Sequence, residues 1–523
     1  MGHRPRGTSR RSFLAATAAF AGVSAVPTVG RATPKYVRYN ATSKEGAAML
    51  ESYATAIKRM LALDPRDGRN WFRNAFIHTL DCPHMNWWFF VWHRPYLGYF
   101  EQTVRELGGN PEFAMPYWDW SATGGEQPGY CIPKPMLEGI LTPIDQAYNQ
   151  YISSFDTFYN YLNPALEAFW SGLSNEQLSA LDVRGMPTLA SVWDQAKATM
   201  FATTPYARYL KTGNACLDDD TQVAVSKETV DGGLSAPSFT DFNSGETDQH
   251  SQMAPRNPLI GVLESQPHNL THNNIGGVNH VPNSQLGFMQ DNLSPVDPIF
   301  FLHHSNMDRL WDVWTRKQQS CRLPYLRRGA SWDKYAREKF MFYVNSKGQP
   351  VTQVEAGSYV SMAQFGYTYQ PGTGEDMIGK CPIQVAARAV KGTVKNGVAA
   401  LAASPRALLE KSNAVIAKVT IPYPSSPSAP RSFAVLVNAP GGNTDTSAKS
   451  PYFAGSIAFF GFSPKMAGMP ATFSVPIDRA LRSAQAANAK TLTIQVVPRS
   501  APGTALLRGA PATKLQAASV TVW

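Results

Sequence analysis

Residues 77–107 read IHTLDCPHMNWWFFVWHRPYLGYFEQTVREL, and the rest of the chain is expected to be organised around this stretch. It holds His78, His84 and His93, three of the ten histidines of the protein, together with Cys82. Tryptophan, phenylalanine and tyrosine residues surround them. Three imidazoles in an apolar setting suit a borderline-soft metal such as copper or zinc.

The intervals between these histidines predict where each one lies. Intervals of six and nine residues do not keep side chains on one face of an α-helix. We therefore expect His93 on a helix that runs to about Leu107 and ends at Gly108. His78 and His84 are expected to reach it from a preceding helix end and a loop.

A second histidine cluster follows much later in the chain. His268 and His272 are four residues apart, so one helical turn places both side chains on one face. Another helix is expected to begin near Phe300, and it carries His303 and His304. Two clusters of neutral imidazoles predict two adjacent metal sites, and an uncharged ligand set permits Cu(I), which binds O2. Mg2+ or Ca2+ would require oxygen ligands.

Outside the clusters the pattern changes from helical to β. Residues 46–63 have helical apolar spacing, and residues 141–212 are mostly helical in character. The polar residues 213–257 are predicted to be a long surface excursion. After about residue 375, six short β-branched or alternating runs, separated by Pro, Gly, Ser and Asn clusters, predict a small antiparallel β domain.

Residues 1–32 are predicted to be a twin-arginine export signal, because SRRSFL at 9–14 precedes an Ala-rich, weakly apolar run. That run is too short to span a bilayer, and no other segment approaches the required length. The net charge of +10 includes five arginines of this leader, and no dense Lys/Arg stripe follows. Nucleic-acid binding is therefore not indicated, and a periplasmic or secreted location is expected.

The five cysteines are few and scattered, so a disulfide framework is not predicted, and the odd number leaves at least one unpaired or modified. They are Cys82, Cys131, Cys216, Cys321 and Cys381.

Three motifs resemble those of the type-3 dicopper proteins, which include tyrosinases, catechol oxidases and, more distantly, molluscan hemocyanins. They are His-x5-His-x8-His-Arg from His78, Pro-His-Asn-x2-His-x2-Ile-Gly-Gly from Pro267, and Asp-Pro-Ile-Phe-Phe-Leu-His-His-Ser-Asn-x-Asp-Arg-Leu-Trp from Asp297. The resemblance covers about residues 35–370. It implies two copper ions, copper A held by His78, His84 and His93, and copper B held by His268, His272 and His304.

The resemblance also implies roles around the metals. Glu264 and Asn269 match a pair that holds a water near copper B, and such a water removes the phenol proton. Asn273 is expected to hydrogen-bond on the substrate side. Asp308, one helical turn after His304, is expected to accept the free N–H of that ring and to fix its tautomer.

Two further positions follow from the resemblance. Cys82 and His84 match the arrangement that family members cross-link as a thioether, and a buried free thiol is the alternative. Asp291, thirteen residues before His304, takes the place of a bulky phenylalanine that covers copper A in plant catechol oxidases. Without an aromatic gate we expect wider access and a preference for cationic substrates.

The expected fold is a mainly α catalytic domain, a four-helix bundle that holds the dicopper site, followed by a smaller all-β, sandwich-like domain. The predicted boundaries are 1–32 for the signal, 33–375 for the catalytic domain, 376–415 for a linker and 416–523 for the β domain. The last part resembles the β domain of plant polyphenol oxidases, and related domains cover the copper site and keep the enzyme latent. A permanently docked structural domain is the alternative.

The expected activity is copper-dependent oxidation of phenols by O2, which hydroxylates monophenols at the ortho position and oxidises o-diphenols to o-quinones. A catechol oxidase that lacks the first step is the alternative within this class. Two alternatives come from other classes: a hemocyanin-like O2 carrier and a zinc hydrolase. A zinc hydrolase usually requires the glutamate of an H-E-x-x-H motif, which residues 268–272 lack. The expected partners are small phenols and O2, and the oligomeric state is not indicated.

Overall fold

The computed structural model describes residues 34–197, 207–252, 259–282, 285–381, 389–410, 414–427, 429–440, 445–499 and 515–523. The predicted export signal lies outside these ranges. None of the helices within them is long and apolar enough to cross a membrane.

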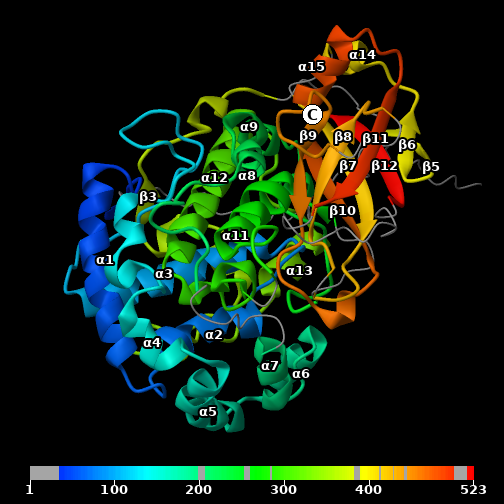
Figure 1. Cartoon of the computed structure of the whole chain (residues 1–523). Coiled ribbons are helices and arrows are strands. Elements are labelled where there is room, and N and C mark those ends of the chain that lie inside the picture. The colour runs from blue at the N-terminus through cyan, green and yellow to red at the C-terminus, as the bar shows by residue number, and fades with distance from the viewer. Residues whose placement is uncertain are drawn as a thin grey trace, which may run out of the picture.

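The larger part of the molecule is a helical body, which fills the left and lower parts of Figure 1. Four helical segments carry the histidines at its centre except His84, which lies in the loop between two of them, as expected from the motifs. They are α2 (Trp71–Asp81), α3 (Phe89–Gly108), a π-helical turn (Glu264–His268) continued by α11 (Asn269–Gly276), and α12 (Ile299–Ser320). The predicted helical catalytic core is thereby confirmed.

Local sequence signals explain where these helices begin and end. Asn70 caps α2, because its side chain accepts hydrogen bonds from the backbone N–H groups of Phe72 and Arg73. Ser43 caps α1 (Lys44–Ala62) in the same way, and α1 packs along α3. α3 ends at Gly109, whose φ of 71° is a left-handed conformation that glycine adopts without a steric penalty.

The remaining helices of this body are α4 (Gln146–Ile152), α5 (Phe155–Ser171), α6 (Asn175–Arg184), α7 (Leu189–Gln195), α8 (Asp219–Ala224), α9 (Lys227–Leu234), α10 (Phe239–Phe242) and α13 (Ala330–Arg337). The prediction of a surface excursion over residues 213–257 is wrong for the described part. There α8, α9 and α10 form, and Leu217, Val230 and Leu234 are buried. Many of the polar residues in this region are helix caps, which the sequence pattern does not distinguish from loop residues.

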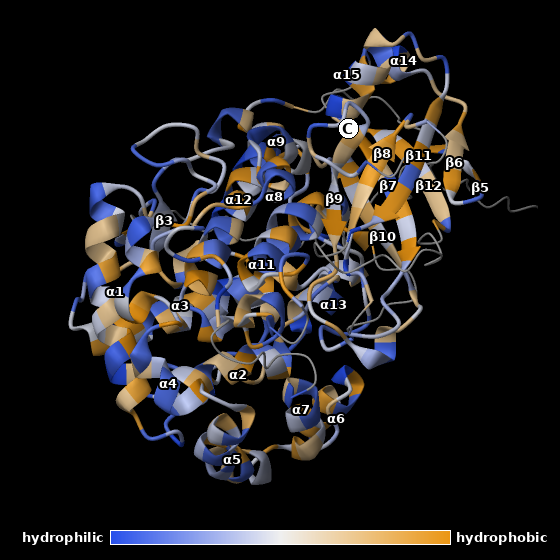
Figure 2. Ribbon diagram, in the orientation of Figure 1, coloured by the Kyte–Doolittle hydropathy of each residue, from blue (hydrophilic) through white to orange (hydrophobic). Residues whose placement is uncertain are grey.

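The second part is built on two five-stranded sheets at the upper right of Figure 1. Six of its strands match the six predicted runs: β7 (Val415–Pro422), β8 (Ser432–Val437), β9 (Phe453–Ala458), β10 (Pro470–Pro476), β11 (Leu492–Pro498) and β12 (Ala517–Val522). The sheet orders are β2-β10-β7-β12-β4 and β5-β6-β11-β8-β9. Figure 2 shows how strongly apolar β7 and β8 are. Two helices, α14 (Pro405–Leu409) and α15 (Asp478–Ala486), accompany the sheets, so the part is not purely β.

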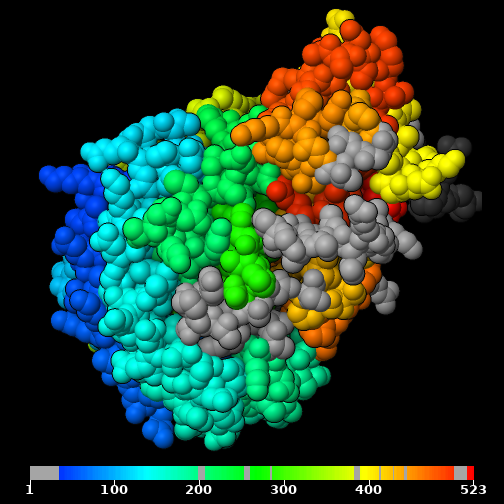
Figure 3. All heavy atoms as spheres, viewed as in Figure 1, coloured from blue at the N-terminus to red at the C-terminus, as the bar shows by residue number. Residues whose placement is uncertain are grey.

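Among the described residues, four short strands outside the six predicted runs also pair in the two five-stranded sheets. Within the predicted linker, β4 (Val390–Lys391), β5 (Thr393–Lys395) and β6 (Val398–Leu401) pair inside the two sheets. β2 (Leu259–Ile260) precedes the second histidine cluster, yet it pairs in parallel with β10. The helical and β parts therefore share a sheet, and Figure 3 shows them packed against each other over the visible face.

Disulfides correct the cysteine prediction. Cys131 is bonded to Cys216 and Cys321 to Cys381, while Cys82 is a buried free thiol. The partners are 85 and 60 residues apart, so the pairing depends on tertiary folding and not on local spacing.

Candidate metal centre

The first histidine cluster lies at the meeting point of α2 and α3. His78 comes from α2, His93 from α3, and His84 from the loop between them. One ligand atom from each histidine and from Cys82 lies within 4.8 Å of the others, and all four residues are buried. This is the placement that the six- and nine-residue intervals predict.

Backbone carbonyls orient the rings of this cluster. His78 Nδ1 lies 2.8 Å from the carbonyl oxygen of Asn292, and His93 Nδ1 lies 2.7 Å from that of Phe89. A carbonyl accepts only from a protonated nitrogen, so each Nδ1 donates and Nε2 keeps its lone pair for a metal. His78 Nε2 has no hydrogen-bond partner among the described residues.

In the second cluster, too, hydrogen bonds from Nδ1 to oxygen atoms orient the rings. His268 and His272 lie on one helical face with ring centroids 4.5 Å apart. His272 Nδ1 lies 2.6 Å from the carbonyl oxygen of Met289, and His268 Nδ1 lies 2.7 Å from Asn269 Oδ1. His272 Nε2 and His304 Nε2 lie 3.1 Å apart, so the two nitrogens aim at one point.

His303 and His304 both lie within reach of the second cluster. His304 stacks on His93 of the first cluster at 4.1 Å and lies 5.0 Å from His268, so its ring stands between the two clusters. His303 packs against Trp120 at 4.9 Å, and neither of its ring nitrogens has a partner in the described part of the chain. Geometry favours His304 as the ligand, and the choice between the two rings stays a prediction.

Burial keeps every ring of both clusters neutral. It lowers the pKa of His93 and of His272 to about 3, and it lowers the pKa of the other rings well below the ordinary value, with the neighbouring histidines adding to the effect. The neutral imidazole is the form that binds a metal. The predicted pair of adjacent sites fits two copper ions.

Glu264 holds the loop that carries His84. Its carboxylate accepts a hydrogen bond from Met85 N at 2.5 Å and a second, short one from Ser244 Oγ. Met85 has a φ of 58°, a strained conformation for a residue with a side chain, and this hydrogen bond stabilises it. Burial raises the pKa of Glu264 to about 7.

Glu264 and Asn269 were predicted to hold a water together, and this stays a prediction. Among the described residues no hydrogen bond joins the two side chains directly. Asn269 uses Oδ1 for His268 and donates from Nδ2 to the carbonyl oxygen of Ala458 at 2.7 Å. The Asn269 amide that was expected to hold a water is therefore hydrogen-bonded to the β part.

The role predicted for Asp308 is wrong. Its carboxylate accepts from Arg94 Nε at 2.8 Å, from Arg38 Nη1 at 3.4 Å, and from the hydroxyl groups of Tyr367 and Tyr369. His304 Nδ1 has no partner among the described residues. Two arginines and two tyrosines outcompete a neutral ring for one buried carboxylate, because hydrogen bonds to a charge are strongest when the donors are cationic or acidic.

Asp291 does not form an open gate. It is fully buried, and a side chain on Gly461 would lie only 2.7 Å from its Oδ1, so the loop of the β part runs directly over it. An aromatic ring does cover the site, but it is Phe460 from the same loop. Its ring centroid lies 4.4 Å from that of His84 and 4.6 Å from that of His272.

His250 is a buried histidine that belongs to neither cluster. Its Nε2 lies 2.9 Å from Asp81 Oδ1 and its Nδ1 lies 2.5 Å from Glu338 Oε1. Burial alone would lower its pKa, but the two carboxylates raise it to about 9. Sequence reasoning missed it, because a lone histidine carries no motif.

We expect the stability that His250 provides to depend on pH. An unfolded histidine has a pKa of about 6.5, so the contribution is complete below that pH and is lost as the pH rises through about 9. The effect is on the order of 3 kcal/mol. Urea unfolding between pH 6 and pH 9.5 should show this decline in the native chain and a flatter profile in His250→Gln; parallel profiles would contradict the assignment.

Comparisons with known proteins agree with this geometry. A family model described as the common central domain of tyrosinase matches residues 64–317. The chain is 25% identical to the chloroplastic polyphenol oxidase of Spinacia oleracea over 62% of this chain and 45% of that protein. It is 25% identical to tyrosinase HcTyr1 of Hahella sp. (strain CCB-MM4) over 62% of this chain and 60% of that protein. The chain thus spans about half the length of the curated relatives it matches.

Solved structures share the fold of nearly the whole chain. Latent aurone synthase (polyphenol oxidase) superposes with a TM-score of 0.56 at 20% identity, covering 94% of this chain and 91% of that one. Latent apple tyrosinase gives 0.54 at 19% identity, covering 94% and 97%. A functional unit of octopus hemocyanin gives 0.51 at 14% identity, covering 93% and 100%.

Proposed function

Because the chain belongs to the tyrosinase and polyphenol oxidase family, we propose that it oxidises phenols with O2 at a pair of copper ions. The observation that carries this proposal is the meeting of two buried clusters of neutral imidazoles. When bound, the copper pair supplies the redox chemistry that activates O2. His78, His84 and His93 would hold one ion, and His268, His272 and His304 the other.

The proton of the phenol needs an acceptor, because a phenol ordinarily has a pKa of about 10. We assign this role to Glu264, with Asn269 beside the second cluster. Glu264 stands one helical turn before His268 and hydrogen-bonds the residue after His84, so its carboxylate connects the two clusters. Asn269 becomes available to a water or substrate only when its bond to Ala458 opens.

The test is an assay of the copper-loaded chain with tyrosine and with a catechol. Oxidation of both supports the full tyrosinase reaction. Oxidation of the catechol alone would reduce the proposal to a catechol oxidase. Reversible O2 binding without turnover, both in the intact chain and in a chain with Phe460→Ala, would favour an O2 carrier. A firm preference for zinc, or binding of a single copper ion, would contradict a coupled pair.

We further propose that the β part keeps the enzyme latent. Phe460 lies against rings of both clusters, where a phenol ring would have to bind. Just before Phe460 in the chain, the carbonyl oxygens of Ala458 and Phe459 accept from the amides of Asn269 at 2.7 Å and Asn273 at 3.1 Å. The residues expected to face the substrate are thus engaged by the β part.

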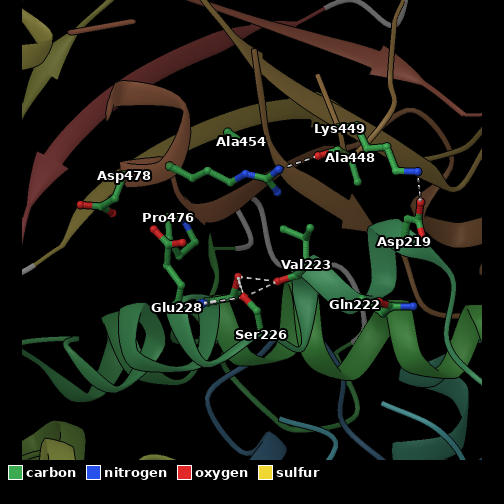
Figure 4. A pocket seen from close by; sticks show the side chains of 12 residues that line it. Asp219, Gln222, Val223, Ser226, Glu228, Ala448, Lys449, Ala454, Pro476 and Asp478 are labelled. Carbon is green, nitrogen blue, oxygen red and sulfur yellow. Dashed lines mark hydrogen bonds and ion pairs between the residues drawn. The ribbon is translucent and has the colours of Figure 1, made fainter. Parts of the chain in front are cut away.

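The seam between the two parts is polar enough to open. In the described residues, each of the four ion pairs across it places the cation on the β part and the carboxylate on the helical part: Lys418–Asp241, Lys449–Asp219, Arg482–Glu228 and Arg499–Asp220. Figure 4 shows one of them, Lys449–Asp219, beside a pocket of about 410 Å³ that both parts line. Such interfaces resemble transient ones, so displacement of the β part is feasible.

We predict that Cys82 forms a thioether to His84 during the first turnovers with copper and O2. Cys82 Sγ lies 3.8 Å from His84 Nδ1 and 3.7 Å from Nε2. The bond replaces the thiol hydrogen and one ring hydrogen, and O2 accepts the two electrons. Mass spectrometry of the digested, copper-treated protein should find residues 82–84 lighter by two hydrogens and without an alkylatable thiol. An alkylatable thiol after turnover would leave Cys82 as a plain core residue.

Export by the twin-arginine route is also part of the proposal. The motif at 9–14 lies outside the described residues, but the disulfides Cys131–Cys216 and Cys321–Cys381 suit an oxidising compartment. Replacing Arg10 and Arg11 by lysine should leave the protein inside the cell.

A further inference from the structure

Arg184 is a buried cation beside the first cluster. It is the last residue of α6, and only 4% of it is exposed. Its Nε donates to the carbonyl oxygen of Thr79 at 2.9 Å, and its Nη2 to that of His78 at 3.4 Å. Its Nη1 has no hydrogen-bond partner, and no carboxylate lies within ion-pair distance of it in the described part of the chain. A buried charge without a counter-ion is costly, so this arrangement favours binding of an anion.

Arg184 also lines the space that Phe460 closes. A narrow cavity of about 10 Å³, room for about one water molecule, has Arg184, Met85 and Asn292 on its helical side. Phe460 and Phe462 form part of its other wall. On its outer side Arg184 borders a larger pocket of about 420 Å³, lined also by Asp248 and Lys465. Arg184 therefore lines both the small cavity beside Phe460 and the larger pocket.

We propose that Arg184 is a specificity-determining residue, which binds a carboxylate on the substituent of the phenol after Phe460 has moved away. This inference rests on the proposed phenol oxidation. A phenol ring that replaces Phe460 against His84 and His272 would place its substituent in the cavity beside Arg184. The planar guanidinium matches a carboxylate geometrically, and such charge-assisted hydrogen bonds are the strong ones.

A carboxylate-binding Arg184 favours an anionic substrate, whereas Asp291 suggested a cationic one. Asp291 is fully buried, and the nearby Arg431 interacts with it electrostatically. Arg431 therefore offsets part of the Asp291 charge. Asp81 also interacts electrostatically with Arg184, but its two oxygens are engaged by Trp92 and His250.

A purely structural role for Arg184 would be to tie α6 to the last turn of α2 through its two backbone contacts. The two roles differ in selectivity. Loss of a structural tie affects all phenols alike, whereas loss of a carboxylate site affects only substrates that carry the carboxylate.

The experiment uses the copper-loaded, full-length chain with Phe460→Ala, with and without Arg184→Gln. KM and kcat are measured for 3-(3,4-dihydroxyphenyl)propionic acid and for its methyl ester. We expect Arg184→Gln to raise KM for the acid by about 10- to 100-fold and to leave the ester within about twofold. Arg184→Lys keeps the positive charge but loses the planar, bidentate guanidinium. Its KM for the acid should lie between those of the chains with Arg184 and with Arg184→Gln. An equal change for acid and ester would overturn the inference.

Two further readouts keep the test decisive. If Arg184→Gln does not fold, the Phe460→Ala chain alone must still show a lower KM for the acid than for the ester, and equal values would overturn the inference. If neither phenol is oxidised, the proposed function fails. The affinities for benzoate and for benzamide, measured by calorimetry, then test separately whether Arg184 binds a carboxylate. Selective benzoate binding that Arg184→Lys weakens supports the site, and equal binding of the two overturns it.

Discussion

Replacing His304 by alanine is expected to remove one copper ion and to lower catechol oxidation by about 10³-fold, since a catalytic metal supplies several kcal/mol of barrier reduction. His304 Nε2 meets His272 Nε2 at 3.1 Å, and its ring contacts rings of both clusters. Copper per chain, measured by atomic absorption, and turnover in the Phe460→Ala chain both report the loss.

His303→Ala is the matched control, because it removes the same ring one residue earlier on α12. His303 lies within reach of the second cluster but packs on Trp120, whereas it is His304 whose Nε2 lies 3.1 Å from His272 Nε2. We therefore expect both copper ions to remain and the main effect to be a loss of stability. The opposite result, with copper lost from His303→Ala and retained in His304→Ala, would exchange the two assignments.

Phe460→Ala is expected to raise catechol turnover by about 10- to 100-fold in the intact chain. Burying a phenylalanine side chain is worth about 1.5–3 kcal/mol, and each 1.4 kcal/mol changes an equilibrium tenfold. Removal of the ring thus weakens docking of the loop, and it also vacates the space against His84 and His272. Initial rates at equal copper content measure the effect.

Phe462→Ala is the control for this prediction. Phe462 lines the same small cavity and packs against Tyr423, within the β part. Its loss removes a similar apolar area without emptying the space against the histidines, so turnover should change far less than in Phe460→Ala. Equal activation by both variants would indicate a general loosening of the β part. If neither variant is activated, the β part is a permanently docked structural domain and not an inhibitory one.

The metal centre was predictable because much of its information is local. The four-residue interval between His268 and His272 places both on one helix face. The intervals of six and nine residues around His84 exclude a shared helix face for the first cluster. The six β runs after residue 375 likewise carry their alternation in the sequence, and β7 to β12 each overlap one of them, although β9 ends at Ala458, before residues 459–462 of its run. The predictions that failed concern contacts between distant segments, such as the pairing of Cys131 with Cys216 and the four partners of Asp308.

The sequence by itself determined the helical core, the β part and the two groups of histidines, because helix and strand periodicity, caps and ligand spacing act over a few residues. Only the tertiary structure decided that Phe460 lies against those histidines and that Glu264 holds the His84 loop. It also decided that Arg184 is buried with one nitrogen that has no hydrogen-bond partner among the described residues. These features arise where elements far apart in the chain pack together. Their energies depend on shape and on desolvation at the contact, which no local pattern encodes.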